Sequence, residues 1–143
     1  MEIVAIWWSY GGYILIFGFM VLTNNFNSSE FACKDATAVP SALLGNLLEL
    51  ARNLQVLRDE LGAPITIRSG FRTISHNQKI GGAKNSYHLR AMAADFVVPG
   101  YTTVLVFTKI FELIKNGKMK PGGLHAYGSW VHYDIRGFLQ LYK

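Results

Sequence analysis

The clearest hydrophobic pattern in the chain is a set of leucines spaced three or four residues apart, with polar residues between them. That spacing places the leucines on one face of an α-helix. The residues are Leu47, Leu50, Leu54, Leu57 and Leu61, set against Glu49, Arg52, Asn53 and Asp59. Val39-Pro40-Ser41 is typical of a helix start and Gly62-Ala63-Pro64 of a helix end. The pattern predicts a helix that packs one face on a sheet.

A second helix is predicted from Thr102 to Lys115, because apolar residues recur there at helical spacing and Gly117 follows its expected end. The residues expected to face inward are Val106, Ile110, Leu113 and Ile114.

Short apolar runs predict four strands, around Ile65, Phe96, Leu124 and Val131. In residues 130–136 the polarity alternates with period two, which places side chains on opposite faces of a strand. Trp130, His132, Asp134 and Arg136 would share one face, and Val131, Tyr133 and Ile135 the other. Helices and strands together indicate the α+β class in one folded domain, since there is no internal repeat or long linker.

The N-terminal segment 1–22 is predicted to lie outside that domain, which would occupy residues 23–143. From Ile3 to Thr23 there is no charged residue, and the run is long enough to cross a bilayer as a helix. A secretory signal would begin with positive charge, but only Glu2 precedes the run. A membrane anchor, an export signal and an upstream extension all remain open for this segment.

The composition is typical of a folded domain, but it does not identify the binding partner. Half of the residues are hydrophobic, and the formal net charge is +5, which favours polyanionic surroundings. The basic residues are dispersed and do not form a stripe with stacking aromatics, so nucleic acid is not expected as a partner. Cys33 is the only cysteine. A thiolate-rich metal site and an intramolecular disulfide are therefore excluded.

Two separated runs supply candidate metal ligands. Residues 86–95, Ser-Tyr-His-Leu-Arg-Ala-Met-Ala-Ala-Asp, and residues 130–134, Trp-Val-His-Tyr-Asp, together contain two imidazoles and a carboxylate. Three ligands of this kind, with one position left for water, are typical of catalytic zinc. Each histidine could instead be a hydrogen-bonded structural residue. Asp95 is predicted inside a buried strand, where it needs a metal, Arg72 or a backbone cap as its partner.

Several motifs in order resemble the M15-type zinc D-Ala-D-Ala peptidases, in particular small single-domain members from bacteria and phages. They are Ser69-Gly70-Phe71-Arg72, His76-Asn77, the stretch from Gly81 to Ser86, and the two runs above, within a likeness that extends from about Leu22 to Gly137. The resemblance implies a hedgehog/DD-peptidase fold with a central, mainly antiparallel sheet, bound Zn²⁺ and a peptidoglycan peptide as substrate. By position it implies His88, Asp95 and His132 as zinc ligands, and Arg72 and Ser86 as substrate contacts.

Further roles follow from the residue types. The guanidinium of Arg72 would hold a substrate carboxylate or the developing oxyanion. For Asp134 three roles are open: an outer partner of the metal site, a general base acting through water, or the salt-bridge partner of Arg136. His125 is a replacement base, an extra ligand or an incidental surface residue.

The chain departs from the family pattern at two places that matter for activity. Ala91 stands where a glycine is usual, which has a cost if the backbone there has a positive φ. The stretch from Leu124 to Trp130 has no carboxylate, although the family places a catalytic acid a few residues before the last histidine. Asp134 or His125 would then move the proton.

These features predict a zinc peptidase that cleaves peptidoglycan stem peptides, as a D-Ala-D-Ala carboxypeptidase or as a cell-wall endopeptidase. The alternative is a peptidoglycan-binding module that keeps the zinc fold without turnover. Either would act at the cell envelope, exported, membrane-anchored or delivered there by a phage. The oligomeric state is left open.

Overall fold

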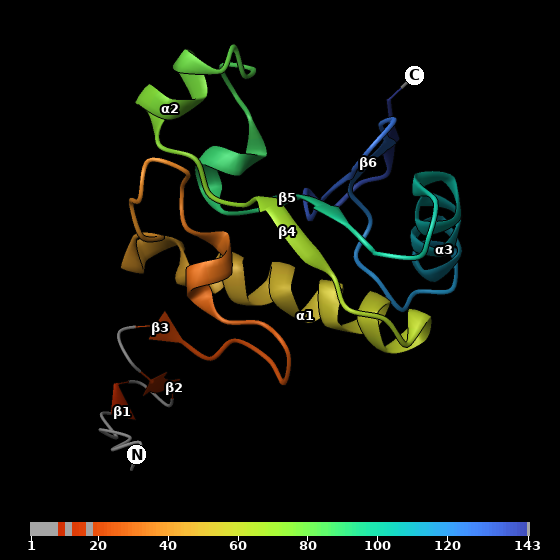
Figure 1. Ribbon diagram of the computed structural model, residues 1–143, viewed down its shortest axis with the longest axis horizontal. Helices are drawn as coiled ribbons and strands as arrows, with labels where there is room; N and C mark the ends of the chain where they lie inside the picture. Colours follow the sequence, from red (N-terminus) through yellow and green to blue (C-terminus); the bar gives the residue numbers. More distant parts are fainter. Residues whose placement is uncertain (1–8, 11–12, 17–18, 143) are drawn as a thin grey trace.

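A five-stranded sheet with helices packed against it forms the centre of the protein, as the computed structural model shows (Figure 1). The structure describes residues 9–10, 13–16 and 19–142. Its long helices are α1 (Leu44–Leu61) and α3 (Thr103–Lys115), and α2 (Ile74–Lys79) is a short one. The strands of the central sheet are β4 (Thr66–Ser69), β5 (Ala93–Val97), β6 (Gly123–Ala126), β7 (Val131–Asp134) and β8 (Gln140–Leu141). Short 3₁₀ turns are η1 (Ser28–Phe31), η2 (Ser41–Leu43) and η3 (Tyr87–Arg90). The predicted α+β class is confirmed.

The central sheet has the strand order β4-β5-β7-β6-β8 and is antiparallel except where β8 runs parallel to β6. Its register pairs Ser69 with Asp95, Asp95 with His132, and His132 with His125. Directly opposed residues of neighbouring strands lie on the same face of a sheet. The register therefore sets these four polar side chains in one row across one face.

The other face of the sheet belongs to the hydrophobic core. On β7, Val131 and Tyr133 are 1% and 0% exposed, which confirms the alternation predicted for this strand. Ala94 and Phe96 of β5 and Leu124 of β6 join the same buried cluster. Burying each large apolar side chain of this kind stabilises the fold by about 1.5–3 kcal/mol. The core thus fixes the strands whose opposite face carries the polar row.

Helix α1 supplies the other side of the core, as its leucine spacing predicts. Leu47, Leu50, Leu54 and Leu57 are fully buried, whereas the predicted fifth member, Leu61, is only partly buried at the end of the helix. The chain enters α1 through the 3₁₀ turn η2 and leaves it at Gly62, whose φ of 60° is the left-handed conformation that glycine adopts without strain.

Helix α3 also agrees with its predicted span. Thr102 is its N-cap, with the side-chain oxygen accepting a hydrogen bond from the backbone N–H of Leu105 at 3.2 Å. Val106, Ile110, Leu113 and Ile114 are buried. The amphipathic pattern therefore located both long helices.

Ala91 adopts the conformation for which glycine is better suited. It ends the turn η3 with a φ of 53° and is 1% exposed. A left-handed backbone costs a residue with a Cβ about 1–2 kcal/mol. The chain therefore carries local strain between His88 and Asp95, and the surrounding packing maintains it.

The N-terminal part contains a small antiparallel sheet of β1 (Ser9–Tyr10), β2 (Tyr13–Ile16) and β3 (Phe19–Met20). Much of the hydrophobic segment 1–22 lies outside the described residues. No helix in the described part of the chain has both the length and the hydrophobicity needed to cross a membrane. An anchor or export signal in this segment, and the domain boundary after it, remain predictions.

Candidate metal centre and its cavity

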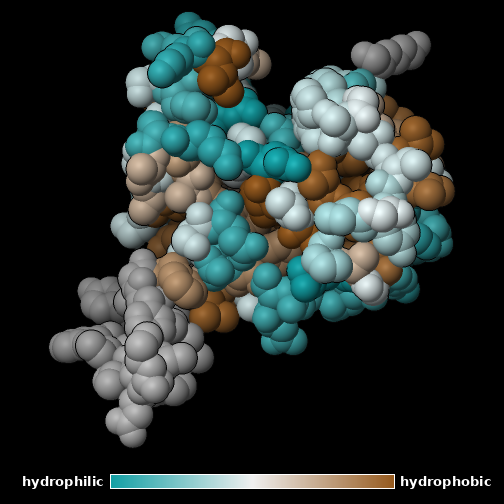
Figure 2. All heavy atoms as spheres, in the orientation of Figure 1, coloured by the Kyte–Doolittle hydropathy of each residue, from teal (hydrophilic) through white to brown (hydrophobic). Residues whose placement is uncertain are grey.

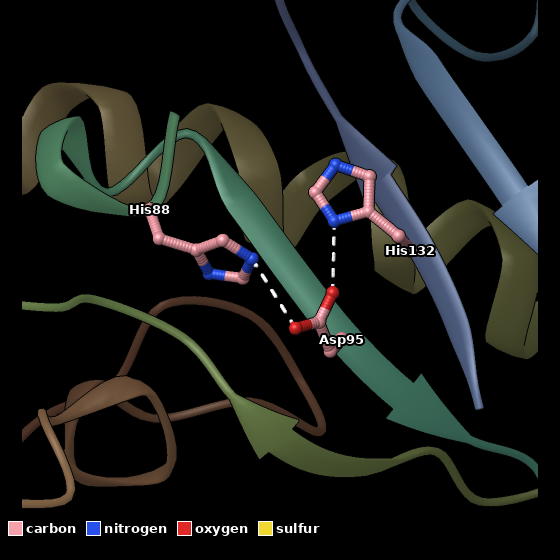
Figure 3. A group of neighbouring side chains, drawn as sticks. All are labelled: His88, Asp95 and His132. Atoms are coloured by element: carbon pink, nitrogen blue, oxygen red, sulfur yellow. Dashed lines mark hydrogen bonds and ion pairs between the residues drawn. The ribbon is translucent and has the colours of Figure 1, made fainter. Parts of the chain in front are cut away.

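Three side chains from separate elements converge at one point above the sheet (Figure 3). They are His88 from the turn η3, Asp95 from β5 and His132 from β7. One ligand atom of each lies within 4.8 Å of the other two, a separation that fits a single metal ion. The structure thus brings together the three residues that the sequence named as ligands.

His88 is held so that one ring nitrogen faces the cluster. Its Nδ1 lies 2.7 Å from the carbonyl oxygen of Gly70. A carbonyl oxygen only accepts, so Nδ1 donates this hydrogen bond, and Nε2 is the ring nitrogen left to face the cluster. That Nε2 is 3.3 Å from Asp95 Oδ2. With 3% exposure, the His88 side chain has little freedom to turn away.

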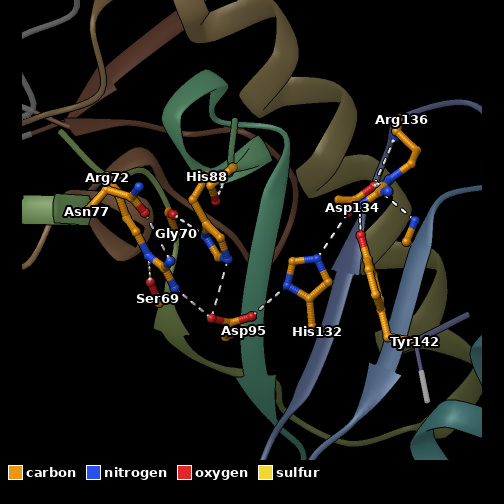
Figure 4. A network of polar contacts seen from close by, with 12 residues as sticks. Ser69, Gly70, Arg72, Asn77, His88, Asp95, His132, Asp134, Arg136 and Tyr142 are labelled. Carbon is orange, nitrogen blue, oxygen red and sulfur yellow. Dashed lines mark hydrogen bonds and ion pairs between the residues drawn. The ribbon is translucent and has the colours of Figure 1, made fainter. Parts of the chain in front are cut away.

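Asp95 stands at the centre of a polar network that crosses the sheet (Figure 4). Its Oδ1 is 2.8 Å from His132 Nδ1, and its Oδ2 accepts a hydrogen bond from Arg72 Nη2 at 2.9 Å. Burial raises the pKa of the Asp95 carboxyl, but hydrogen bonds with His132 and His88 outweigh burial and hold the pKa below its ordinary value. Asp95 is therefore an ionised carboxylate near neutral pH, the form that binds a metal.

His132 lies between two carboxylates. Its Nδ1 faces Asp95, and its Nε2 is 3.0 Å from Asp134 Oδ2. Burial lowers the pKa of the His132 imidazole, but the contacts with Asp134 and Asp95 outweigh burial and raise the pKa above its ordinary value. Metals bind neutral imidazole, so protons compete with a metal for this residue.

Asp134 contacts both the candidate metal ligand His132 and Arg136, the salt-bridge partner considered in the sequence analysis. Besides His132, its carboxylate accepts hydrogen bonds from Arg136 Nε at 2.8 Å and Arg136 Nη2 at 2.6 Å, and from the backbone N–H of Gly123 at 2.9 Å. Its side chain is 0% exposed. The contacts expected of an outer partner of the metal site and of a salt-bridge partner therefore occur together in one buried carboxylate.

Arg72 and Ser86 both line the cavity above the cluster, and each also supports it. Arg72 donates to Ser69 Oγ at 3.0 Å as well as to Asp95. Ser86 is the N-cap of η3, and its Oγ accepts from the backbone N–H of His88 at 3.3 Å. The two residues implied as substrate contacts thus also hold Asp95 and His88 in place.

His125 lies beside the cluster but is not among the residues that line the cavity. It is the cross-strand partner of His132, and its Nδ1 is 2.7 Å from the carbonyl oxygen of Tyr142. Since a carbonyl oxygen accepts, Nδ1 donates. His125 therefore links strand β6 to Tyr142, the residue that follows β8.

The cluster forms part of the wall of a cavity of about 520 Å³. In Figure 2 this face is hollowed between the lobe that carries α2 and the lobe that carries β6 and the C-terminal end. Tyr127 and Trp130 stand on the cavity wall with their rings stacked 4.6 Å apart, and both remain partly exposed. The cavity thus offers an aromatic wall beside the donor cluster.

Several residues of the site were not identified as functional from the sequence. Asn77 is 2% exposed, and its amide contacts Arg72 and the carbonyl oxygen of Ala83. Arg136 lies over the rings of Tyr87 and Tyr142. The presence of Asn77 in a family motif was the one signal for it. The contact between Arg136 and Tyr87 joins residues far apart in the sequence, and it gave no signal.

An α+β domain in which two histidines and an aspartate meet in a cavity defines a candidate metal-dependent enzyme of the hydrolytic kind. Residues 24–134 match the family described as Peptidase M15, which is most of the chain. The protein therefore belongs to the M15 peptidase family, as its motifs indicated. The match begins directly after the hydrophobic N-terminal segment.

Two curated relatives are similar over part of the chain. The zinc D-Ala-D-Ala carboxypeptidase of Streptomyces albus G is 38% identical over 73 residues, which is 50% of this chain and 28% of the relative. The probable peptidoglycan L,D-endopeptidase MepK of Haemophilus influenzae is 31% identical over 94 residues, or 62% of this chain and 48% of the relative. The matched region thus spans less than half the length of each relative.

Proposed function

We propose that this protein is a zinc-dependent peptidase that hydrolyses a peptide bond in peptidoglycan stem peptides. The observation that carries the proposal is the convergence of one ligand atom each from His88, Asp95 and His132 within 4.8 Å beside a cavity. Membership of the M15 family and the names of the two relatives support the same activity and substrate class.

The donor set fits zinc in a catalytic role. Two imidazole nitrogens and one carboxylate oxygen leave a coordination position for water or substrate. Each histidine also has the second contact typical of a zinc ligand, because the Gly70 carbonyl fixes His88 and the Asp134 carboxylate fixes His132. Bound zinc supplies Lewis-acid chemistry, polarising a carbonyl and lowering the pKa of water.

The chain's own side chains would bind and orient the substrate around this centre. Arg72 and Ser86 line the cavity, so we assign them to substrate contact, in line with the family resemblance. A guanidinium directed at a developing oxyanion lowers its energy because it brings a fixed positive charge to it. Tyr127 and Trp130 would exclude water from one side of the bound peptide.

We assign Asp134 a positioning role that acts through His132. Both of its oxygens already accept hydrogen bonds and its side chain is fully buried, so neither oxygen is free to take a proton from water in the cavity. His125 is assigned to holding Tyr142 and not to proton transfer, because it does not line the cavity.

Asp134→Asn is expected to weaken zinc binding by about 10–100-fold, the usual effect of losing an outer partner of a ligand. His125→Ala is expected to leave zinc affinity unchanged and turnover within a few-fold of the parent protein. Competition titration against a zinc chelator, followed by turnover assays at saturating zinc, measures both effects. Full zinc affinity in Asp134→Asn with turnover abolished would instead identify Asp134 as the general base.

A binding module without turnover is the second candidate function, and one observation favours it. Asp95 and Asp134 are the only carboxylates that line the cavity in the described part of the chain, and both are held in the network. The acidic residue that the family usually places before the last histidine has no replacement there.

Metal analysis of the purified protein, with mass spectrometry of its products on muropeptides, tests the proposal. Stoichiometric zinc and released fragments are expected. Zinc with binding to purified sacculi but no fragments would establish the binding module. Absence of zinc at equilibrium with excess metal would contradict both candidates.

A further inference from the structure

A second cavity, of about 440 Å³, opens next to the metal cluster. It is lined by Arg68, Ser69, Asp95, Ser129 and Trp130. The first cavity shares Asp95 and Trp130 with it. The two cavities therefore adjoin at Asp95, one of the three candidate metal donors. A substrate whose scissile peptide bond is held there would place the residues on one side of the bond in the first cavity and those on the other side in the second.

Arg68 distinguishes the second cavity from the first. Three arginines line the two cavities, and two of them are engaged, Arg72 with Asp95 and Arg136 with Asp134. Arg68 lies on β4 with an exposed side chain and forms no ion pair or side-chain hydrogen bond with any residue that the structure describes. Its guanidinium donors are therefore available to a ligand.

Two hydroxyl groups add donors to the same cavity. Ser69 Oγ accepts from Arg72 Nε at 3.0 Å, so its own hydrogen can be donated elsewhere. Ser129 makes no side-chain hydrogen bond within the described ranges and is exposed. One guanidinium and two hydroxyls are the groups that bind a carboxylate well.

The Asp95 carboxylate also lines this cavity, but it does not repel a bound anion. The charge of Asp95 is paired with Arg72 at 2.9 Å, and a bound cation would neutralise it further. Trp130, which is 37% exposed, supplies an apolar surface beside these donors. The cavity therefore combines anion-binding groups with room for a small apolar side chain.

We propose that this second cavity binds the free C-terminal carboxylate of the residue released by cleavage, with Arg68 as its main contact. The inference rests on the proposed peptidase function and narrows it to carboxypeptidase action. The two relatives do not decide this point, because one is named a carboxypeptidase and the other a probable endopeptidase.

The test compares two substrates on the zinc-loaded full chain. One is an acylated peptide that ends in D-Ala-D-Ala with a free carboxylate, and the other is the same peptide with a C-terminal amide. The parent protein is expected to prefer the acid by roughly 10–100-fold in kcat/KM, the range for a hydrogen-bonded charged group. Arg68→Gln is expected to reduce the acid-to-amide ratio towards one, mainly through a higher KM for the acid.

Two further variants separate charge from structure. Arg68→Lys keeps the positive charge and is expected to retain part of the preference. Arg52→Gln makes the same change on the exposed side of α1, away from both cavities, and is expected to keep the full ratio.

The possible outcomes distinguish failure of the carboxylate site from failure of the proposed peptidase function. Equal turnover of acid and amide, or an unchanged ratio in Arg68→Gln, would overturn the carboxylate site alone. Cleavage of muropeptides with an extended leaving group in preference to the free acid would do the same and indicate an endopeptidase. If zinc-loaded protein cleaves neither peptide nor any muropeptide, the peptidase function fails, and this inference fails with it.

Discussion

Replacing His88 with alanine is expected to abolish stoichiometric zinc binding and to lower turnover of muropeptides by about a thousandfold or more. A bound metal contributes several kcal/mol to stabilisation of a hydrolytic transition state, and each 1.36 kcal/mol corresponds to a factor of ten. His88 supplies one of the three donors that cluster in the part of the chain that the structure describes, and its ring is held by the Gly70 carbonyl with 3% exposure. Among the described residues, no further His, Cys, Asp or Glu belongs to this group of candidate ligands.

The measurement is metal content by atomic spectrometry together with product analysis. His76→Ala is a matched control, because His76 lies on α2 outside both cavities and makes no side-chain hydrogen bond within the described part of the chain. Asp95→Asn keeps the side-chain volume, so a loss of zinc and of turnover in this variant would not come only from misfolding. Full zinc content and turnover in His88→Ala would exclude this cluster as the metal centre.

The second large effect is expected from Gly122→Ala, which should reduce the free energy of unfolding by about 3 kcal/mol or more. A Cβ at Gly122 would lie 1.5 Å from the backbone carbonyl oxygen of Asp134, a contact that only a backbone shift could relieve. Overpacking against backbone is among the costlier substitutions. Such a shift would also move β7, which carries His132, so zinc affinity should fall as well.

Urea unfolding of the metal-free protein measures the stability, and zinc titration measures the second effect. Gly128→Ala is the control, because a Cβ there meets nothing within 4 Å, and its effect should stay within about 0.5 kcal/mol. An unfolding midpoint of Gly122→Ala equal to that of the parent protein would show that the two segments separate easily at this point.

Much of the secondary structure followed from local pattern. The leucine spacing in α1 and the alternation in residues 130–136 identified which side chains enter the core, because periodicity reports the face of each element directly. The pattern was less informative for short elements. Helix α2 has six residues and β8 has two, too few for a period to be visible.

Ala91 shows what the sequence and the structure each reveal about one position. The comparison of motifs marked the position as one where glycine is usual, and the structure gives the reason, a φ of 53° in a buried turn. The sequence alone did not show whether the backbone required it.

The candidate site divides in the same way. The sequence by itself determined the donor types, two imidazoles and a carboxylate with no thiolate alternative, and the family motifs placed them at His88, Asp95 and His132. Only the tertiary structure decided that these donors meet, that Asp134 is committed to His132 and Arg136, and that His125 lies outside the cavity. The physical reason is that side-chain periodicity fixes a face, whereas strand register and order fix neighbours. Register depends on packing between segments far apart in the chain, and no local stretch of sequence contains that information.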